Sequence, residues 1–323
     1  MNIYKDFVAG HRDYDNYEDL KANFRIEVPE NFNFAYDVVD RYAKEAPEKK
    51  ALVWCDDHNN EKVFTFSEMA QCVNKTANYL VSNGIKKGDA VMLILRRRYE
   101  FWWFILALHK IGAIAVPATN LLLAKDIIFR TNAANIKMIV SFDDSVQNEI
   151  ETAIKDSPSV QKLVTVGEAR NNWEHFHSSF DSYSDEFVRP TGENSTKNTD
   201  VMLLYFTSGT SGNPKMVQHN FAYPLGHIVT ARYWQNVVDD GLHLTVAETG
   251  WAKAMWGKLY GQWLCGSAVF VYDMETFVPD KLLHHIADYG VTTFCAPPTV
   301  YRYMIRQNLD KYDLSKLQYV VTA

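Results

Sequence analysis

Residues 90–117 read AVMLILRRRYEFWWFILALHKIGAIAVP, and this stretch decides the fold class. It begins with a continuous apolar run over 90–95, which is typical of a strand buried on both faces of a parallel sheet. A helix is predicted over 99–110, and Gly112 is placed to end it, because glycine readily adopts the left-handed conformation after a helix. A second apolar strand follows over 113–117. Strand, helix and strand at this spacing predict a βαβ unit with parallel strands.

The same alternation extends in both directions along the chain. Toward the N-terminus, strands are predicted over 51–55 and 63–66, followed by a helix that we place after an N-cap at Ser67 and that ends at Gly84. Toward the C-terminus, strands are predicted over 137–142, 162–166, 201–206, 242–246, 267–272, 291–296 and 317–322, and helices over 124–134, 144–155, 220–234, 251–264, 279–289 and 298–307. The sequence therefore predicts an α/β fold of parallel sheets flanked by helices.

The alternation is interrupted between residues 167 and 200, where the chain is polar and irregular. We place a subdomain boundary there, with an N-terminal α/β subdomain over 1–190 and a second, incomplete α/β subdomain over 191–323. His175 and His177 lie in this stretch, but two histidines without a third ligand do not make a metal site, so no metal ligands are predicted.

Composition excludes several classes of protein. The chain has 323 residues with 33 Lys+Arg and 39 Asp+Glu, a net charge of −6, which argues against a nucleic-acid partner. Its four cysteines form no CxxC pair, so free thiols in a reducing cytoplasm are expected rather than disulfides or a zinc site. The N-terminus is polar and acidic, without an apolar signal region, and no apolar run is long enough to span a membrane. We therefore expect a cytoplasmic enzyme or binding protein.

Residues 207–215 read TSGTSGNPK and directly follow the predicted strand 201–206. Glycines let backbone N–H groups approach a ligand, hydroxyls donate to anionic oxygens, and a lysine adds a point charge, so polyphosphate is a natural ligand. The segment is not a Walker A loop, because Pro214 stands five residues after Gly209, and Ser211 excludes a G-x-G-x-x-G turn. Composition alone equally favours a solvated turn, since Asn-Pro is ordinary turn chemistry.

The order of residues 207–217 matches every fixed position of [ST]-S-G-[ST]-[ST]-G-x-P-K-x-V. It resembles the signature loop of the AMP-forming adenylate enzymes, which include acyl-CoA synthetases, peptide-synthetase adenylation domains and firefly luciferase. In that family the loop holds the β- and γ-phosphates of ATP. The resemblance implies that Lys215 offsets charge on the pyrophosphate leaving group as a catalytic residue, and that the phosphate is bound by Thr207, Ser208, Gly209, Thr210, Ser211, Gly212 and Lys215.

Segments 64–123, 247–273 and 296–307 are also similar to this family, and most similar to its short- and medium-chain acyl-CoA or acetyl-CoA synthetases. The resemblance implies a carboxylate substrate with ATP, Mg²⁺ and coenzyme A, and formation of acyl-AMP and then acyl-CoA. Trp251, in the order Thr-Gly-Trp, would line the acyl pocket, although a tryptophan that begins an apolar helix is as often a core residue. Transfer of the acyl group to another acceptor is the alternative, as is a non-catalytic nucleotide-binding fragment.

Three further candidates are weaker. The cluster Arg96–Arg98 follows a strand, where α/β sites gather, but a solvated cluster paired with Glu100 is favoured. Arg170 is a candidate contact to a phosphate of coenzyme A, because in related ligases the segment around it lies near the nucleotide of coenzyme A. His219 follows the loop and either orients it or is a structural histidine.

The family's adenine, ribose and magnesium motifs and its C-terminal lid domain are not found in these 323 residues. We therefore expect an N-terminal fragment of a longer enzyme that is inactive alone. An unfinished sheet would expose apolar surface, so we also expect self-association.

Overall fold

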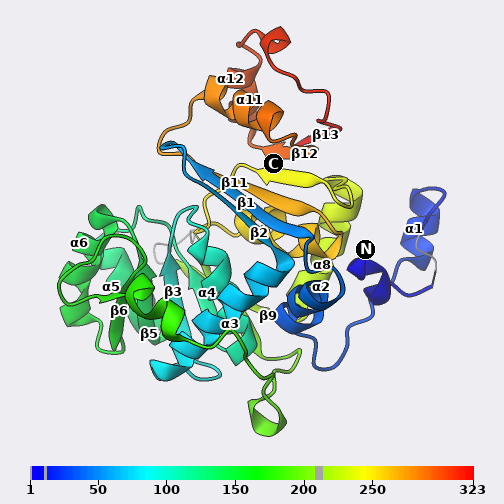
Figure 1. Cartoon of the computed structure of the whole chain (residues 1–323). Coiled ribbons are helices and arrows are strands. Elements are labelled where there is room, and N and C mark those ends of the chain that lie inside the picture. Colours follow the sequence, from blue (N-terminus) through cyan, green and yellow to red (C-terminus); the bar gives the residue numbers. More distant parts are fainter. Residues whose placement is uncertain (1, 11–12, 208–213) are drawn as a thin grey trace.

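The computed structural model describes residues 2–10, 13–207 and 214–323. Over these residues two β-sheets lie against each other with helices between and around them (Figure 1). The first sheet has the order β7-β6-β5-β3-β4-β8-β9 and the second β13-β12-β10-β11-β1-β2. The strands are β1 (Lys50–Asp56), β2 (Glu61–Thr65), β3 (Ala90–Ile94), β4 (Ile114–Pro117), β5 (Ile136–Ser141), β6 (Lys162–Thr165), β7 (Glu174–His175), β8 (Val201–Thr207), β9 (Lys215–Asn220), β10 (Leu242–Thr245), β11 (Ala268–Asp273), β12 (Thr293–Ala296) and β13 (Tyr319–Thr322).

The helices cover the outer faces of the sheets and fill the space between them (Figure 1). The α-helices are α1 (Tyr17–Asn23), α2 (Arg41–Glu45), α3 (Phe66–Ser82), α4 (Glu100–Ile111), α5 (Ala124–Ala134), α6 (Asp144–Ala153), α7 (Phe176–Ser179), α8 (Tyr223–Val229), α9 (Lys253–Gly257), α10 (Tyr260–Leu264), α11 (Pro279–Asp288) and α12 (Pro298–Met304). Short 3-10 segments are η1 (Ile3–Phe7), η3 (Ile154–Asp156), η4 (Phe180–Ser182), η5 (Gly192–Asn194) and η7 (Leu309–Lys311), and π-helical segments are η2 (Ala35–Asp40) and η6 (Thr230–Trp234).

The predicted parallel sheets are confirmed, with two antiparallel additions. β3 pairs in parallel with β4 and β5, and β10 pairs in parallel with β11 and β12. The antiparallel pairs are β1–β2 and β8–β9. The sequence does not predict β9, because Met216 and Val217 are adjacent and the segment lacks the apolar–polar alternation of a strand. The predicted helix 220–234 accordingly begins only at Tyr223.

The sheets do not follow the predicted ranges 1–190 and 191–323. β8 and β9 lie after residue 190 but extend the first sheet, through the parallel pair Ala115–Leu203. β1 and β2 lie early in the chain but extend the second sheet, where β1 pairs with β11. Each sheet therefore contains strands from both ranges, and the division into subdomains at residue 190 stays a prediction.

Helix boundaries also differ from the sequence-based expectation at the start of α3 and within residues 251–264. The N-cap of α3 is Thr65 rather than Ser67, because the Thr65 hydroxyl accepts from the Glu68 N–H and the Glu68 carboxylate accepts from the Thr65 N–H, a reciprocal capping box. The predicted helix 251–264 is two helices, α9 and α10, because Lys258 and Leu259 both have φ of −153° and leave the helical region. Gly112 ends α4 with φ +81°, as predicted.

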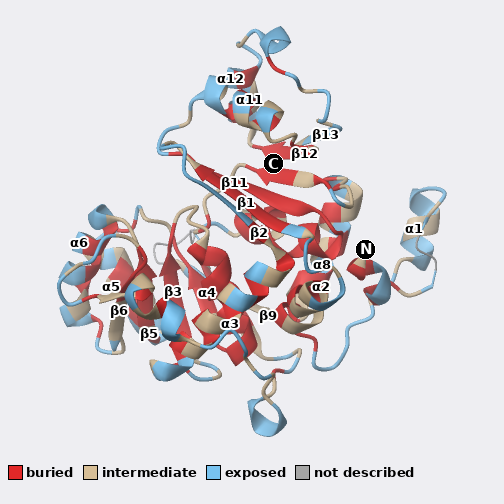
Figure 2. Cartoon of the chain, viewed as in Figure 1, coloured by how far each residue is buried: buried red, intermediate tan, exposed pale blue. Residues whose placement is uncertain are grey.

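Helix α4 is the centre of the molecule. All of its 12 residues are buried, and the largest apolar cluster surrounds it with side chains from both sheets (Figure 2). A helix apolar on every side is stable only when packed on every side. Its three buried polar side chains have partners: Glu100 pairs with Arg98, His109 with the Tyr260 hydroxyl, and Lys110 with Asp40. No helix in the described ranges has the length and apolar character to span a membrane.

Candidate functional site

A cavity of about 490 Å³ lies where carboxyl ends of strands from both sheets meet. Its walls come from the segment after β4, from α5, from the end of β8, from the residue before β9, and from the segment between β10 and α9. Open α/β sheets bind ligands beyond the carboxyl ends of their strands, so this place in the fold favours a ligand site. We call this cavity the site pocket, and its lining residues are Pro117, Ala118, Thr119, Leu122, Arg130, Tyr205, Phe206, Thr207, Pro214, Gly250, Trp251 and Ala252.

The two ends of the predicted phosphate loop lie at the site pocket. Thr207 ends β8 and Pro214 follows the loop, and both line the cavity. Lys215 begins β9 directly opposite Thr207 in the antiparallel ladder, and its exposed side chain is outside the lining of the pocket. The strand pair thus holds the loop ends together. Ser208, Gly209, Thr210, Ser211 and Gly212 lie outside the described residues, and their phosphate contacts stay a prediction.

Trp251 is 61% exposed and lines the site pocket. It is therefore not a core residue, whereas Trp263 is fully buried and belongs to the core. The structure brings Trp251 and Thr207, which are far apart in the sequence, to one cavity. Contact between Trp251 and an acyl group stays a prediction.

The Thr-Gly-Trp segment is held against the first sheet by its first two residues. The Thr249 backbone N–H donates to the Arg96 carbonyl oxygen over 3.0 Å, and the Thr249 hydroxyl donates to the same oxygen. Gly250 packs so closely on the turn after β4 that a Cβ there would lie 2.4 Å from the Thr119 nitrogen and 2.5 Å from the Ala118 carbonyl carbon. Only glycine fits at this position, and it places Trp251 at the rim of the pocket.

The arginine cluster 96–98 also joins the two sheets. Arg98 pairs with Glu100 at 3.1 Å, as predicted, but the cluster is not solvated, because all three side chains are partly buried and Glu100 is fully buried. Arg96 and Arg97 donate to the Met274 carbonyl oxygen, directly beyond β11, over 3.1 and 3.3 Å. Arg96 and Arg97 therefore connect the carboxyl end of β3 to the carboxyl end of β11.

Buried charges behind the pocket were missed by the sequence analysis. Glu248 accepts from the Gly250 N–H over 3.2 Å, and burial raises its pKa. Burial also raises the pKa of Asp273, which faces the arginine cluster. Lys258 is 1% exposed and donates to the Ala247 carbonyl oxygen over 2.9 Å, and burial, with the nearby Arg97 charge, lowers its pKa to about 7. In the sequence, Lys258 lies within an apolar segment, and the apolar pattern of that segment predicts one continuous helix.

The weaker candidates are placed elsewhere by the structure. Arg170 is bound by the Glu151 and Asp144 carboxylates, at 2.6 and 3.2 Å, so its charge is already compensated. His219 stacks on Tyr223 with ring centroids 3.9 Å apart, and burial lowers its pKa. His175 and His177 bond to different partners, and no cluster of three or more potential metal ligands occurs in the described part of the chain.

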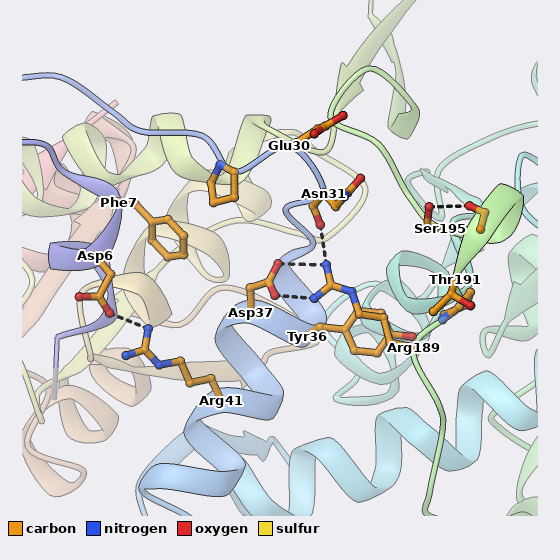
Figure 3. Close-up of a pocket in the computed structure, with 13 residues that line it drawn as sticks. Asp6, Phe7, Glu30, Asn31, Tyr36, Asp37, Arg41, Arg189, Thr191 and Ser195 are labelled. Atoms are coloured by element: carbon orange, nitrogen blue, oxygen red, sulfur yellow. Dashed lines mark hydrogen bonds and ion pairs between the residues drawn. The ribbon is translucent and has the colours of Figure 1, made fainter.

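A larger cavity of about 840 Å³ lies between η1, residues 29–37 and residues 189–195 (Figure 3). Figure 3 shows that its two arginines are each held by a carboxylate, Arg41 by Asp6 at 2.6 Å and Arg189 by Asp37 at 2.6 Å. Neither end of the phosphate loop lines it. The site pocket is therefore the better candidate, although it is smaller.

The chain is similar to known proteins over most of its length. Residues 39–323 match the family described as AMP-binding enzyme. The chain is 31% identical over 330 residues to the mitochondrial acyl-coenzyme A synthetase ACSM3 of Mus musculus, covering 99% of this chain and 56% of that protein. It is 34% identical over 304 residues to the mitochondrial ACSM4 of Homo sapiens, covering 92% and 52%. The chain thus spans about half the length of the curated relatives it matches.

Two solved structures share the fold at 22% sequence identity. One is the anthranilate CoA ligase AuaEII in complex with anthranoyl-AMP, with a TM-score of 0.80 over 91% of this chain and 55% of that one. The other is an acyl-CoA synthetase of Brucella canis, with a TM-score of 0.79 over 90% of this chain and 54% of that one.

Replacing Gly250 with alanine should destabilise the protein by about 2 kcal/mol or more, because the added Cβ overlaps backbone atoms that cannot move aside. Gly226→Ala is the matched control, since a Cβ at Gly226 in α8 would meet nothing within 4 Å. Urea unfolding followed by tryptophan fluorescence measures both variants. Equal stability of the two variants would show that the close approach at Gly250 is not a constraint.

Replacing Lys258 with methionine should change how stability depends on pH. The lysine pKa is about 7 in the folded protein and 10.5 when unconstrained, so between these values the unfolded state binds more protons. The free energy of unfolding of the wild type should therefore rise by about 2 kcal/mol more than that of Lys258→Met between pH 7 and pH 9. Lys125→Met, at an exposed position of α5, is the control and should keep the wild-type profile. Parallel profiles for wild type and Lys258→Met would contradict the lowered pKa.

Proposed function

Because the chain belongs to the AMP-binding enzyme family, we propose that it carries the phosphate loop and acyl pocket of an AMP-forming acid–thiol ligase. In the proposed reaction a carboxylate oxygen attacks the α-phosphorus of ATP, and the bond to the β-phosphate oxygen breaks to release pyrophosphate. The thiol of coenzyme A, losing its proton, then attacks the acyl carbonyl carbon of the acyl-AMP. The acyl–phosphate bond breaks, AMP leaves, and acyl-CoA is formed.

The observation that carries this proposal is the meeting of Thr207, Pro214 and Trp251 at one pocket. A ligase of this type must hold a polyphosphate and an apolar acid side by side, since the two reacting groups are both anionic and must be aligned. The loop ends supply hydroxyl and ammonium donors through Thr207 and Lys215, next to an apolar wall. Lys215 would offset the charge that develops on the pyrophosphate leaving group.

The lining of the pocket supports a short- or medium-chain fatty acid as the substrate. Its walls are mainly apolar, from Pro117, Leu122, Phe206, Trp251 and Ala252. Pockets of a few hundred Å³ with apolar walls and a few polar groups are typical of small-molecule sites. The relatives named acyl-coenzyme A synthetases favour coenzyme A over another acceptor and an acyl-CoA ligase over a non-catalytic nucleotide-binding protein. Acetyl-CoA synthetase activity falls within this proposal as its shortest-chain case.

Mg²⁺ enters this proposal only as the counter-ion of ATP. Magnesium bound with a nucleotide is usually held by substrate phosphates and one or two carboxylates rather than by a cage of protein ligands. No cluster of three or more acidic or other metal-binding side chains occurs over the described residues, and no step of the reaction is assigned to a magnesium site of the protein.

Two further proposals concern the chain as a whole. We propose a cytoplasmic location, supported by cysteines that are all free in the structure, although the matched relatives are named as mitochondrial; fractionation of the source cells tests it. We also propose self-association, supported by β13, an edge strand on which Tyr319 and Val320 are 49% and 56% exposed. Light scattering that shows a monomer at all concentrations would contradict it.

The function is tested by ATP binding and by exchange of pyrophosphate into ATP. Wild-type protein should bind ATP, and Lys215→Ala should weaken this about tenfold or more, because a charge-assisted hydrogen bond is lost. Lys311→Ala, at an exposed lysine in η7, is the control and should bind ATP as the wild type does. Calorimetry measures the affinities.

Exchange of labelled pyrophosphate, with acids from acetate to octanoate, identifies the carboxylate. Exchange by the enzyme that contains this chain should depend on the acid, and this chain alone should show none. An enzyme that binds ATP without any acid-dependent exchange would contradict ligase activity. Robust exchange by the chain alone would contradict its expected inactivity.

A further inference from the structure

Arg130 is the only charged side chain on the wall of the site pocket among the residues that the structure describes. It projects from the second half of α5, and its guanidinium carbon lies 5.3 Å from the centre of the Phe206 ring, which also lines the pocket. One of its nitrogens donates to the Asp126 carbonyl oxygen over 3.0 Å. A guanidinium has five N–H donors, so this bond leaves most of them available.

No carboxylate of the described residues lies within 4.0 Å of the Arg130 nitrogens. Arg97 also has no carboxylate of the described residues within 4.0 Å, but it lies outside the site pocket and is attracted by Asp273. By contrast, a carboxylate pairs with each of Arg41, Arg98, Arg170 and Arg189. Two of these pairs are drawn in Figure 3, in the larger cavity. The contacts of Arg130 are the Phe206 ring and one carbonyl oxygen, and the Asp126 carboxylate attracts it from beyond 4.0 Å.

A partly buried guanidinium without a contacting carboxylate is unfavourable. Burial lowers the pKa of Arg130 and the nearby Asp126 charge opposes this, and the side chain stays charged at neutral pH, because arginine does not lose its proton in proteins. The aromatic ring compensates only part of the lost hydration. An anionic oxygen in the pocket would supply the rest, and it would meet a planar fork of donors suited to phosphate or carboxylate.

We infer that Arg130 binds an anionic oxygen, of a phosphate or a carboxylate, on the ligand that occupies the site pocket. The inference deepens the proposed function and rests on it, since the ligand is taken to be one of the ligase substrates. The neutral hydroxyl of Thr207 adds a donor along the same wall, and the apolar part of the ligand lies along Leu122 and Trp251. Arg130 is thus a binding residue that anchors the charged end of the ligand.

The test compares Arg130→Gln, Arg130→Lys and Arg306→Gln with the wild type. Arg306 is the matched control, because its guanidinium carbon lies 5.7 Å from the Tyr303 ring and it does not line the site pocket. Calorimetry measures the binding of pyrophosphate, octanoate and coenzyme A as three separate probes, at low and high ionic strength. The probe whose affinity falls identifies the source of the anion.

Arg130→Gln should weaken one probe about tenfold and remove most of its dependence on salt. Arg130→Lys should restore part of the affinity, because it restores the charge but not the fork. Arg306→Gln should leave every affinity unchanged. Thermal unfolding without ligand should show no loss of stability in Arg130→Gln, since an uncompensated charge has been removed, whereas a purely structural arginine would lower the unfolding temperature.

Three outcomes overturn the inference. They are wild-type-like affinity of Arg130→Gln for all three probes, an equal loss in Arg306→Gln, and no binding of any probe by the wild type. The first two leave the proposed function standing if the wild type binds ATP. Conversely, binding of pyrophosphate or octanoate that depends on Arg130, without acid-dependent pyrophosphate exchange, supports the role of Arg130 and contradicts the proposed function.

Discussion

Gly250 packs directly on the backbone of Ala118 and Thr119, and this contact sets how closely the two sheets approach at the site. The Thr249 bonds to the Arg96 carbonyl oxygen reinforce it from one side. The contacts of Arg96 and Arg97 with the Met274 carbonyl oxygen reinforce it from the other. Because these contacts lie at the carboxyl ends of the strands, the site pocket is formed where the two sheets meet.

Helix α4 lies behind this contact, at the centre of the molecule. Its complete burial explains why charged and polar groups at its ends are paired, since an unpaired buried charge costs several kcal/mol. The Arg98–Glu100 ion pair lies at one end of α4, and the Lys110–Asp40 ion pair lies at the other. The Trp102 indole donates to the Lys258 carbonyl oxygen over 3.0 Å and so connects this helix to the buried charges behind the pocket. The pocket wall is therefore supported by the packing of α4 and by the ion pairs at the two ends of that helix.

The arginines of this protein differ in how their charge is compensated. Arg98, Arg170 and Arg189 have carboxylates as partners and hold segments of the chain together. Arg130 has an aromatic ring and a carbonyl oxygen, in a pocket with mainly apolar walls. Side-chain chemistry is the same in all four, so only their surroundings distinguish them.

The sequence by itself determined the order of most strands and helices, because period, glycine and capping signals act over a few neighbouring residues. It also determined the phosphate-loop motif, through the residue types over 207–215. Only the tertiary structure decided the sharing of strands between sheets, the exposure of Trp251, and the meeting of Trp251, Arg130 and Thr207 at one pocket. These features depend on contacts between residues far apart in the chain, which local patterning does not encode. The burial of Lys258 and Glu248 belongs with them, since a side chain loses its water only when distant segments close around it.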